Sequence, residues 1–155
     1  MIDIAAAGPE DLDQILALES TGFASTEQWS RQSWHAQLVG GSYLTLAARD
    51  ADGRIVGVLT LRFGADTAEM DRIVVALDQR QQGIARSLVR SSLAAAYDRR
   101  ATEVILEVGV DNEAAMALYR SFGFVELTSR RDYYGPGLDA WVMRLIMEPV
   151  GGGVR

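Results

Sequence analysis

Apolar and polar residues follow one another along the chain with two different spacings, and these spacings predict its secondary structure. Short apolar runs with alternation indicate strands, whereas apolar residues three and four positions apart indicate helices that bury one face. Strands are expected at residues 2–6, 43–48, 54–63, 68–77, 103–110, 124–134 and 140–147. Helices are expected at residues 9–19, 30–38, 85–100 and 112–122.

Several element ends carry residues that favour turns and caps. Pro9 suits the first turn of a helix, because the N–H that it lacks would have no partner there. Ser30 can cap the second helix, whose buried side carries Trp34. Asp52-Gly53 lies between two apolar strands and indicates a hairpin turn.

The order of the elements predicts the fold class. Residues 68–110 form a strand, a helix and a strand, which is typical of a parallel crossover. We therefore expect an α/β protein with one mixed, mostly antiparallel sheet, helices on both faces and this parallel unit at its centre. Ligands of such sheets bind beyond the carboxyl ends of the parallel strands, here near Val75 and Val110. Residues 1–149 should form a single domain and residues 150–155 a flexible tail.

Composition narrows the classes of function. The 155 residues carry a net charge of −6, which disfavours a nucleic-acid binder, because phosphate binding needs clustered Lys and Arg. No apolar run approaches the ~18 residues of a membrane span, and the start lacks the pattern of a signal peptide. Cysteine is absent, which excludes disulfides and thiolate metal sites and fits a reducing cytoplasm. We expect a cytoplasmic protein that contacts neither membrane nor nucleic acid and needs no metal.

The segment "DQRQQGIARSLV" at residues 78–89 joins a strand to a helix and is a candidate anion site. The first turn of a helix presents unpaired N–H groups and the positive end of the helix dipole. Gly83 and the small Ala85 let the backbone approach a ligand, and Arg80 and Arg86 could neutralise a diphosphate. The Gly-Lys-Ser/Thr ending of a Walker loop is missing. On local pattern alone, an ordinary polar turn explains the segment equally well.

Four stretches of the chain resemble the GNAT N-acetyltransferases. "RQQGIA" at residues 80–85 is similar to the R/Q-x-x-G-x-G/A loop that binds the acetyl-CoA pyrophosphate in that family. "LEVGVDNEAAMALYRSFGF" at residues 106–124 resembles its ribosomal-protein-alanine (RimI-type) branch. "RRDYY" at residues 130–134 and "DAWVMRL" at residues 139–145 resemble the closing strands of the same branch. The likeness covers nearly the whole chain, and it implies a GNAT-like single domain.

The resemblance implies acetyl-CoA as the acetyl donor and assigns residues to it. The loop amides would hold the pyrophosphate, and the strand segment before the loop would pair with the pantetheine arm as an added strand would. An N–H near Val75 would bind the thioester oxygen as negative charge develops on it. Asn112 matches a family position that touches the cofactor, although it could equally cap the next helix. The implied cofactor-binding residues are Ile73, Val74, Val75, Arg80, Gln81, Gln82, Gly83, Ile84, Ala85, Arg86 and Asn112.

Glu107 and Tyr119 are the candidate catalytic residues. In strand 103–110, alternation places Val104, Leu106, Val108 and Val110 on one face and Glu107 on the other. A carboxylate among apolar neighbours is costly to bury without a partner or a purpose. The resemblance implies that Glu107 removes a proton from the acceptor ammonium, directly or through water, and that Tyr119 protonates the leaving thiolate. The alternatives are that Glu107 is a satisfied carboxylate at the rim of an exposed face and that Tyr119 is a core residue.

The expected acceptor is the N-terminal amine of a protein, and the resemblance points to the N-terminal alanine of a small-subunit ribosomal protein. Tyr133 and Tyr134 match acceptor-side tyrosines of the family, although aromatic residues on a strand also serve packing alone. Two departures lie near this side: Gln28 where Pro is typical, and Gly109 where relatives often carry Arg. A small-molecule amine, a lysine side chain, a non-catalytic acyl-CoA-binding module and a nucleotide-phosphate binder remain alternatives.

Overall fold

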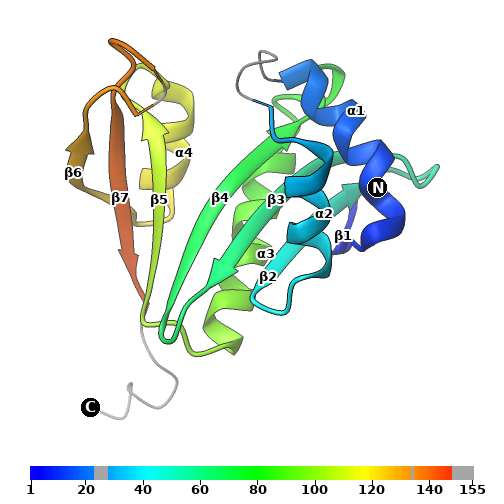
Figure 1. The fold of residues 1–155 in the computed structure, drawn as a ribbon, viewed down its shortest axis with the longest axis horizontal. Coiled ribbons are helices and arrows are strands. Elements are labelled where there is room, and N and C mark those ends of the chain that lie inside the picture. The colour runs from blue at the N-terminus through cyan, green and yellow to red at the C-terminus, as the bar shows by residue number, and fades with distance from the viewer. Residues whose placement is uncertain (23–27, 134, 148–155) are drawn as a thin grey trace. The chain divides into compact units, whose positions relative to one another are not determined.

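The computed structural model describes residues 1–22, 28–133 and 135–147, and it confirms the predicted fold class (Figure 1). The described part contains one seven-stranded sheet with the order β1-β2-β3-β4-β5-β7-β6. The strands are β1 (Asp3–Ala6), β2 (Tyr43–Arg49), β3 (Ile55–Phe63), β4 (Thr67–Val75), β5 (Glu103–Gly109), β6 (Val125–Arg130) and β7 (Ala140–Ile146). The helices are α1 (Leu12–Gly22), α2 (Arg31–Val39), α3 (Ile84–Asp98) and α4 (Glu113–Ser121). The predicted boundary at residue 149 and the tail lie outside the described residues.

The chain divides into two compact units. Unit 1 comprises Met1–Arg62 and Asp71–Ala95, and unit 2 comprises Phe63–Met70 and Ala96–Arg155. Strand β4 contributes its first half to unit 2 and its second half to unit 1. The predicted cofactor loop therefore belongs to unit 1, whereas both candidate catalytic residues belong to unit 2.

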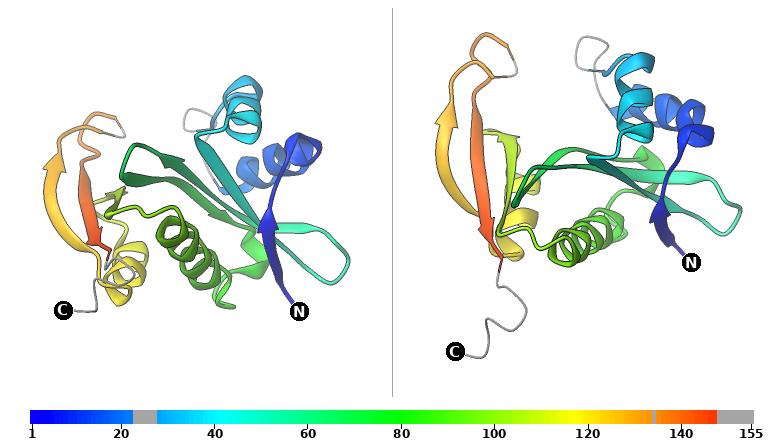
Figure 2. Two further views of the ribbon diagram at one scale, coloured as in Figure 1. Left: turned by 90° about the horizontal axis from the view of Figure 1, so that it is seen from below. Right: turned by 60° about the horizontal axis from the view of Figure 1, so that its bottom comes forward.

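In unit 1, helices cover both faces of the strands. Helices α1 and α2 lie on one face of β2 and β3, and α3 lies on the other (Figures 1 and 2). The predicted hairpin is confirmed, because β2 and β3 pair in an antiparallel register from Tyr43↔Arg62 to Arg49↔Ile55. Gly57 lets α3 approach β3 closely, since a Cβ added there would lie 3.0 Å from Cγ2 of Ile84 and 3.1 Å from Cδ1 of Leu88. This close contact fixes the start of α3 against the sheet.

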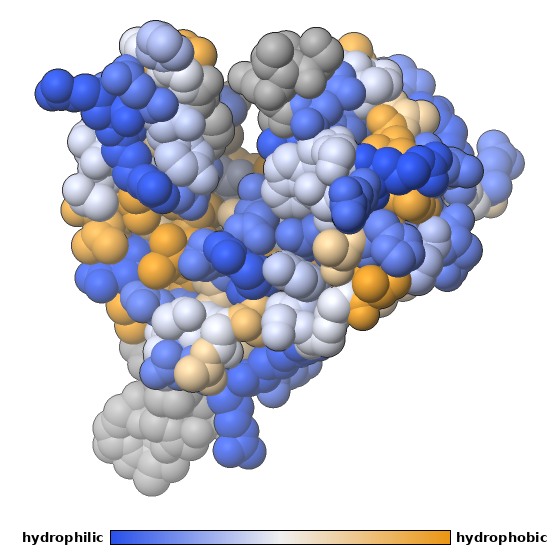
Figure 3. Space-filling view, viewed as in Figure 1, coloured by the Kyte–Doolittle hydropathy of each residue, from blue (hydrophilic) through white to orange (hydrophobic). Residues whose placement is uncertain are grey.

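In unit 2, β5 is central. It pairs in parallel with β4 from Thr67↔Glu103 to Met70↔Leu106, and antiparallel with β7 from Glu103↔Ile146 to Gly109↔Ala140. Helix α4 covers one face of β5 and β7 (Figure 2). Strand β6 is the outer strand of the sheet, and all of its residues are exposed. Figure 3 shows apolar surface over β6 and β7, where Val125, Leu127 and Ile146 are exposed.

Four predicted details were wrong. The strand predicted at 124–134 ends at Arg130, and Tyr133 lies in the turn that follows. The strand predicted at 68–77 ends at Val75, because a 3₁₀ turn, Leu77–Gln79, begins directly after Ala76, whose N–H still donates to the carbonyl oxygen of Val56 (2.8 Å). Val110 lies beyond the end of β5 and is 40% exposed, so it does not share the buried face of its strand. The first helix begins as a separate 3₁₀ turn, Pro9–Asp11. No helix in the described part of the chain is long and apolar enough to cross a membrane.

Candidate active site

The loop before α3 contains two residues with a positive φ. Gly83 has φ of +80°, a region that side-chain-bearing residues rarely adopt, and Gln81 has φ of +63°. A Cβ added at Gly83 would meet no atom within 4 Å, so the space above this residue is open. Helix α3 begins at Ile84, and its first regular bond joins the N–H of Ser87 to the carbonyl of Gly83 (3.0 Å). The N–H groups of the first turn of α3 are thus the donors that a helix N-terminus presents to a ligand.

The strand end and the loop are joined by Arg80. Its Nε donates to the carbonyl oxygen of Val75 (3.3 Å), which brings the predicted pantetheine segment 73–75 and the pyrophosphate loop together within unit 1. The side chain of Ile84 is buried against the sheet and is 3% exposed, so this residue can offer only its backbone to a ligand. The structure therefore places residues 73–75 and 80–86 close together in unit 1, with the side chains of Val74 and Ile84 buried.

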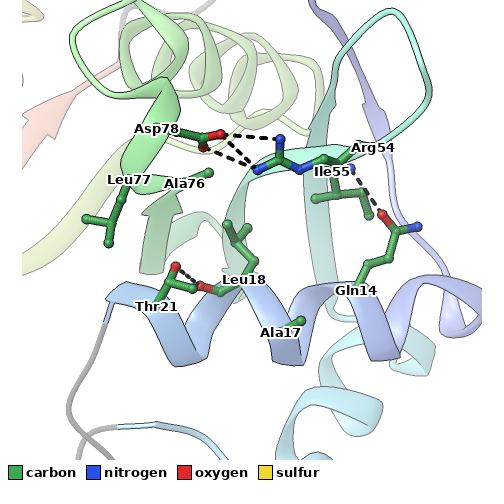
Figure 4. Close-up of a pocket in the computed structure, with 9 residues that line it drawn as sticks. All are labelled: Gln14, Ala17, Leu18, Thr21, Arg54, Ile55, Ala76, Leu77 and Asp78. Atoms are coloured by element: carbon green, nitrogen blue, oxygen red, sulfur yellow. Dashed lines mark hydrogen bonds and ion pairs between the residues drawn. The ribbon is translucent and has the colours of Figure 1, made fainter.

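A separate pocket of about 350 Å³ lies between α1, the start of β3 and the turn that follows β4 (Figure 4). Leu18 and Ile55 form part of its apolar floor, and Oε1 of Gln14 accepts a hydrogen bond from the N–H of Ile55 (3.1 Å). An exposed ion pair lies at its rim, with Nη2 of Arg54 3.2 Å from Oδ1 of Asp78. This pair links the β2–β3 hairpin to the turn that leads into the loop.

The carboxyl of Asp78 should titrate below its ordinary value of 3.8, because the hydrogen bond from Arg54 lowers the pKa of Asp78. The stabilisation that this pair adds is then present above that value and is lost as the pH falls through the lower pKa of the folded state. In a carbon-13 NMR titration, we expect Arg54→Met to move the Asp78 midpoint upward. Added salt should do the same, because the pair is exposed. Identical Asp78 curves for the two proteins would contradict the assignment.

Glu107 is held in place by an arginine to which sequence reasoning gave no role. Its side chain is 18% exposed, and Oε2 lies 2.6 Å from Nη1 of Arg130 at the end of β6. The guanidinium of Arg130 also lies over the ring of Tyr133, 4.6 Å from the centroid. Unit 2 therefore brings the predicted base and one predicted acceptor-side tyrosine to the same arginine. Arg130 stands in the "RRDYY" stretch, which was the available signal; Tyr134 lies outside the described residues.

Tyr119 and Asn112 occupy the ends of α4. Tyr119 is 5% exposed, and its ring meets that of Phe124 edge-on at 5.9 Å between centroids. Asn112 caps the helix, because its Oδ1 accepts a hydrogen bond from the N–H of Ala115 (3.2 Å). The capping role that the sequence left open for Asn112 is thus present, and Tyr119 contributes to the packing of the core.

Comparison with known proteins agrees with the fold and identifies the family. Residues 10–124 match the acetyltransferase (GNAT) family. The chain is 34% identical over 148 residues to the N-alpha-acetyltransferase RimI of Mycobacterium tuberculosis, covering 92% of this chain and 91% of the relative. It is 33% identical over 106 residues to the ribosomal protein bS18-alanine N-acetyltransferase of Escherichia coli, covering 68% and 70%. The crystal structure of the ribosomal-protein-S18-alanine N-acetyltransferase from Escherichia coli superposes with a TM-score of 0.86 at 29% identity, covering 94% of each chain.

The family match and these relatives define this protein as an acetyl-CoA-dependent N-acetyltransferase, and the mixed sheet with its parallel β4–β5 pair agrees with that fold. The chain belongs to the GNAT acetyltransferase family, and the predicted resemblance to its RimI-type members is confirmed.

Proposed function

We propose that this enzyme acetylates the N-terminal amine of a protein in the cytoplasm, with the N-terminal alanine of a small-subunit ribosomal protein as its natural acceptor. The observation that carries this proposal is the likeness, over 94% of both chains, to an enzyme named for the alanine of ribosomal protein S18. The position of Glu107 on β5 supports it, because a carboxylate at this position can accept the proton of the acceptor ammonium. A small-molecule amine or a lysine side chain is the second candidate acceptor.

Unit 1 would hold the cofactor. The open space above Gly83 fits a pyrophosphate, and the amides of residues 81–86, with Arg80 and Arg86, would bind its charge. The backbone of residues 73–75 would pair with the pantetheine arm, since β4 continues past its last register pair with β5, Met70↔Leu106. Bound acetyl-CoA supplies the acetyl group as a thioester. Asn112 would approach the cofactor while it caps α4.

Unit 2 would supply the proton transfers. Glu107 would accept a proton from the acceptor ammonium, directly or through water, and so generate the neutral nucleophile. The amine then forms the new C–N bond as the C–S bond breaks, while an N–H near Val75 stabilises the negative oxygen. The hydroxyl of Tyr119 would give its proton to the leaving thiolate. The ion pair with Arg130 fixes the direction in which the Glu107 carboxylate points.

The chemistry of the site favours an α-amine. An α-amino group has a pKa of about 7.7–8.0, against about 10.4 for lysine, so a single carboxylate can prepare an N-terminus at neutral pH more readily. Tyr133 is 42% exposed beside Arg130, and it would form part of a wall for the acceptor peptide, with Tyr134 next to it in the chain.

The test is a panel of acceptors with acetyl-CoA. It comprises a peptide that starts with Ala, the same peptide with a blocked N-terminus and an internal Lys, and a polyamine. We expect kcat/KM to be highest for the free Ala terminus, and a higher value for either other acceptor would overturn the assignment. A thermal-shift comparison of ATP with acetyl-CoA tests the nucleotide-phosphate alternative. Saturation at 100 times Kd stabilises a protein by about 2.7 kcal/mol, so only the true ligand should raise the Tm strongly.

Gly83→Val should weaken acetyl-CoA binding at least ~10-fold in calorimetry, because a β-branched side chain would enter the open space and disfavour the positive φ. Gly53→Val is the matched control. Gly53 also has a positive φ, +82°, and open space around its missing Cβ, but it lies in the β2–β3 turn. Both variants should lose similar stability, and equal acetyl-CoA affinity in the two would remove the loop from the cofactor site.

A further inference from the structure

Unit 1 contains a buried carboxylate that the proposed reaction does not use. Glu19 lies near the end of α1 and is 1% exposed. Its Oε1 accepts hydrogen bonds from the backbone N–H of Trp29 and from the indole N–H of Trp34, both at 2.9 Å. Its Oε2 forms an ion pair with Nη1 of Arg72 on β4. A buried charge is tolerated only with such partners, so this cluster links α1, the start of α2 and β4 by directional contacts.

The guanidinium of Arg72 is held on two sides. Its side chain is 13% exposed, and besides its bond to Glu19 it lies over the Trp29 ring, 4.5 Å from the centroid. The Trp29 ring in turn packs against the fully buried Trp34, with 4.9 Å between centroids. A planar guanidinium fixed between a carboxylate and an indole face has little freedom to move. The guanidinium of Arg72 is therefore held by Glu19 on α1 and by Trp29, which directly precedes the cap of α2.

Arg72 immediately precedes residues 73–75, the segment proposed to pair with the pantetheine arm. We infer that Glu19 and Arg72 are positioning residues that hold this segment of β4 in the conformation required for acetyl-CoA binding. The inference rests on the proposed function of residues 73–75. Neither side chain is assigned a contact with the reacting atoms, so both act through the backbone of β4. Hydrogen bonds weaken steeply as their angle departs from linear, so a small rotation of this segment would weaken its pairing with the cofactor.

The use of an ion pair rather than apolar packing supports a positioning role. Apolar residues of similar volume usually stabilise a buried position as well as an ion pair does, or better. A carboxylate that accepts three directional bonds, however, specifies one geometry where apolar contacts would permit several. The effect on stability and the effect on positioning can be tested separately. Removing both charges together should restore the stability without restoring the directional contacts.

The experiment compares Arg72→Met with the double variant Glu19→Gln/Arg72→Met. Arg72→Met leaves Glu19 buried without its cation and should lower the Tm. The double variant removes both charges and should regain most of that loss, while the amide oxygen of the introduced glutamine can still accept the two N–H bonds. In both variants we expect KM for acetyl-CoA to rise about tenfold, the effect of roughly one lost hydrogen bond. KM for the peptide should change less than about threefold, because the proposed acceptor-side residue Tyr133 belongs to unit 2. The kcat value should fall together with the affinity for acetyl-CoA, because the N–H near Val75 that would stabilise the negative oxygen belongs to the same segment.

Arg49→Met is the matched control. It breaks another partly buried ion pair of unit 1, between Arg49 on β2 and Asp11 (2.8 Å), and should lower the Tm without changing KM for acetyl-CoA. A KM that returns to the wild-type value in the double variant along with the Tm would overturn the inference and leave the pair a structural role. Absence of acetyl-CoA binding by wild-type protein in calorimetry would instead overturn the proposed function, and the inference with it.

Discussion

Replacing Glu107 with Gln should lower kcat/KM on an Ala-starting peptide by ~10²–10⁴-fold at pH 7, the usual contribution of a general base. The amide keeps the shape of the side chain but accepts no proton at neutral pH. Arg130, the partner of Glu107, is 55% exposed and can be solvated by water, so the fold should survive. Acetyl-CoA affinity should stay within about threefold of wild type, because the proposed cofactor-binding segments of unit 1 are unchanged.

The pH dependence distinguishes a base from a residue that only orients the acceptor. The deficit of the variant should shrink as the pH rises past the α-amine pKa near 8, because neutral amine is then supplied by solution. With a lysine acceptor, any deficit should persist to higher pH. A loss that does not vary with pH would assign Glu107 to acceptor positioning, and wild-type activity would end its catalytic role.

Glu103→Gln is the control for this experiment. Glu103 lies on the same strand and the same face as Glu107, is 25% exposed and pairs with Arg144 at 3.8 Å. Its replacement removes the same charge from unit 2 without touching the proposed base. We expect the control to retain activity within about threefold of wild type, as for a surface ion pair of small energetic value.

Tyr119→Phe should lower kcat by ~10²-fold or more if the hydroxyl protonates the leaving thiolate. The ring remains in its edge-on contact with Phe124, so packing and Tm should change little. KM for acetyl-CoA should be nearly unchanged, since the lost interaction forms only as the C–S bond breaks. A pre-steady-state measurement of thiol release reports this step directly.

Tyr97→Phe is the matched control for Tyr119→Phe, because it also removes one tyrosine hydroxyl. Tyr97 is 37% exposed on α3 and has no assigned part in binding or chemistry. The two variants should therefore have similar stability and very different kcat values. If Tyr119→Phe keeps activity within a factor of about three, Tyr119 is a core residue, as its 5% exposure alone would suggest.

Most of the fold could be predicted from local pattern. Alternation located all seven described strands, and the cap residue Ser30 marked the start of α2, where its Oγ accepts a hydrogen bond from the N–H of Ser33 (3.0 Å). The limits of elements were less accurate. Strand β4 ends at Val75 because a 3₁₀ turn, Leu77–Gln79, follows Ala76, and the apolar pair Ala76-Leu77 gave no local sign of that turn.

For this protein the sequence by itself determined the element order, the parallel β4–β5 crossover, the glycine loop before α3 and the acetyltransferase family, because each depends on short-range spacing and residue type. Only the tertiary structure decided which charges meet. Glu107 pairs with Arg130, which lies 23 residues further along the chain, and Glu19 pairs with Arg72, which lies 53 residues further along. Such pairs form only when strands and helices that are far apart in the sequence pack together. The local pattern around a carboxylate does not show which cation it will meet. The sequence shows a carboxylate among apolar residues, and the tertiary structure shows which arginine forms an ion pair with it.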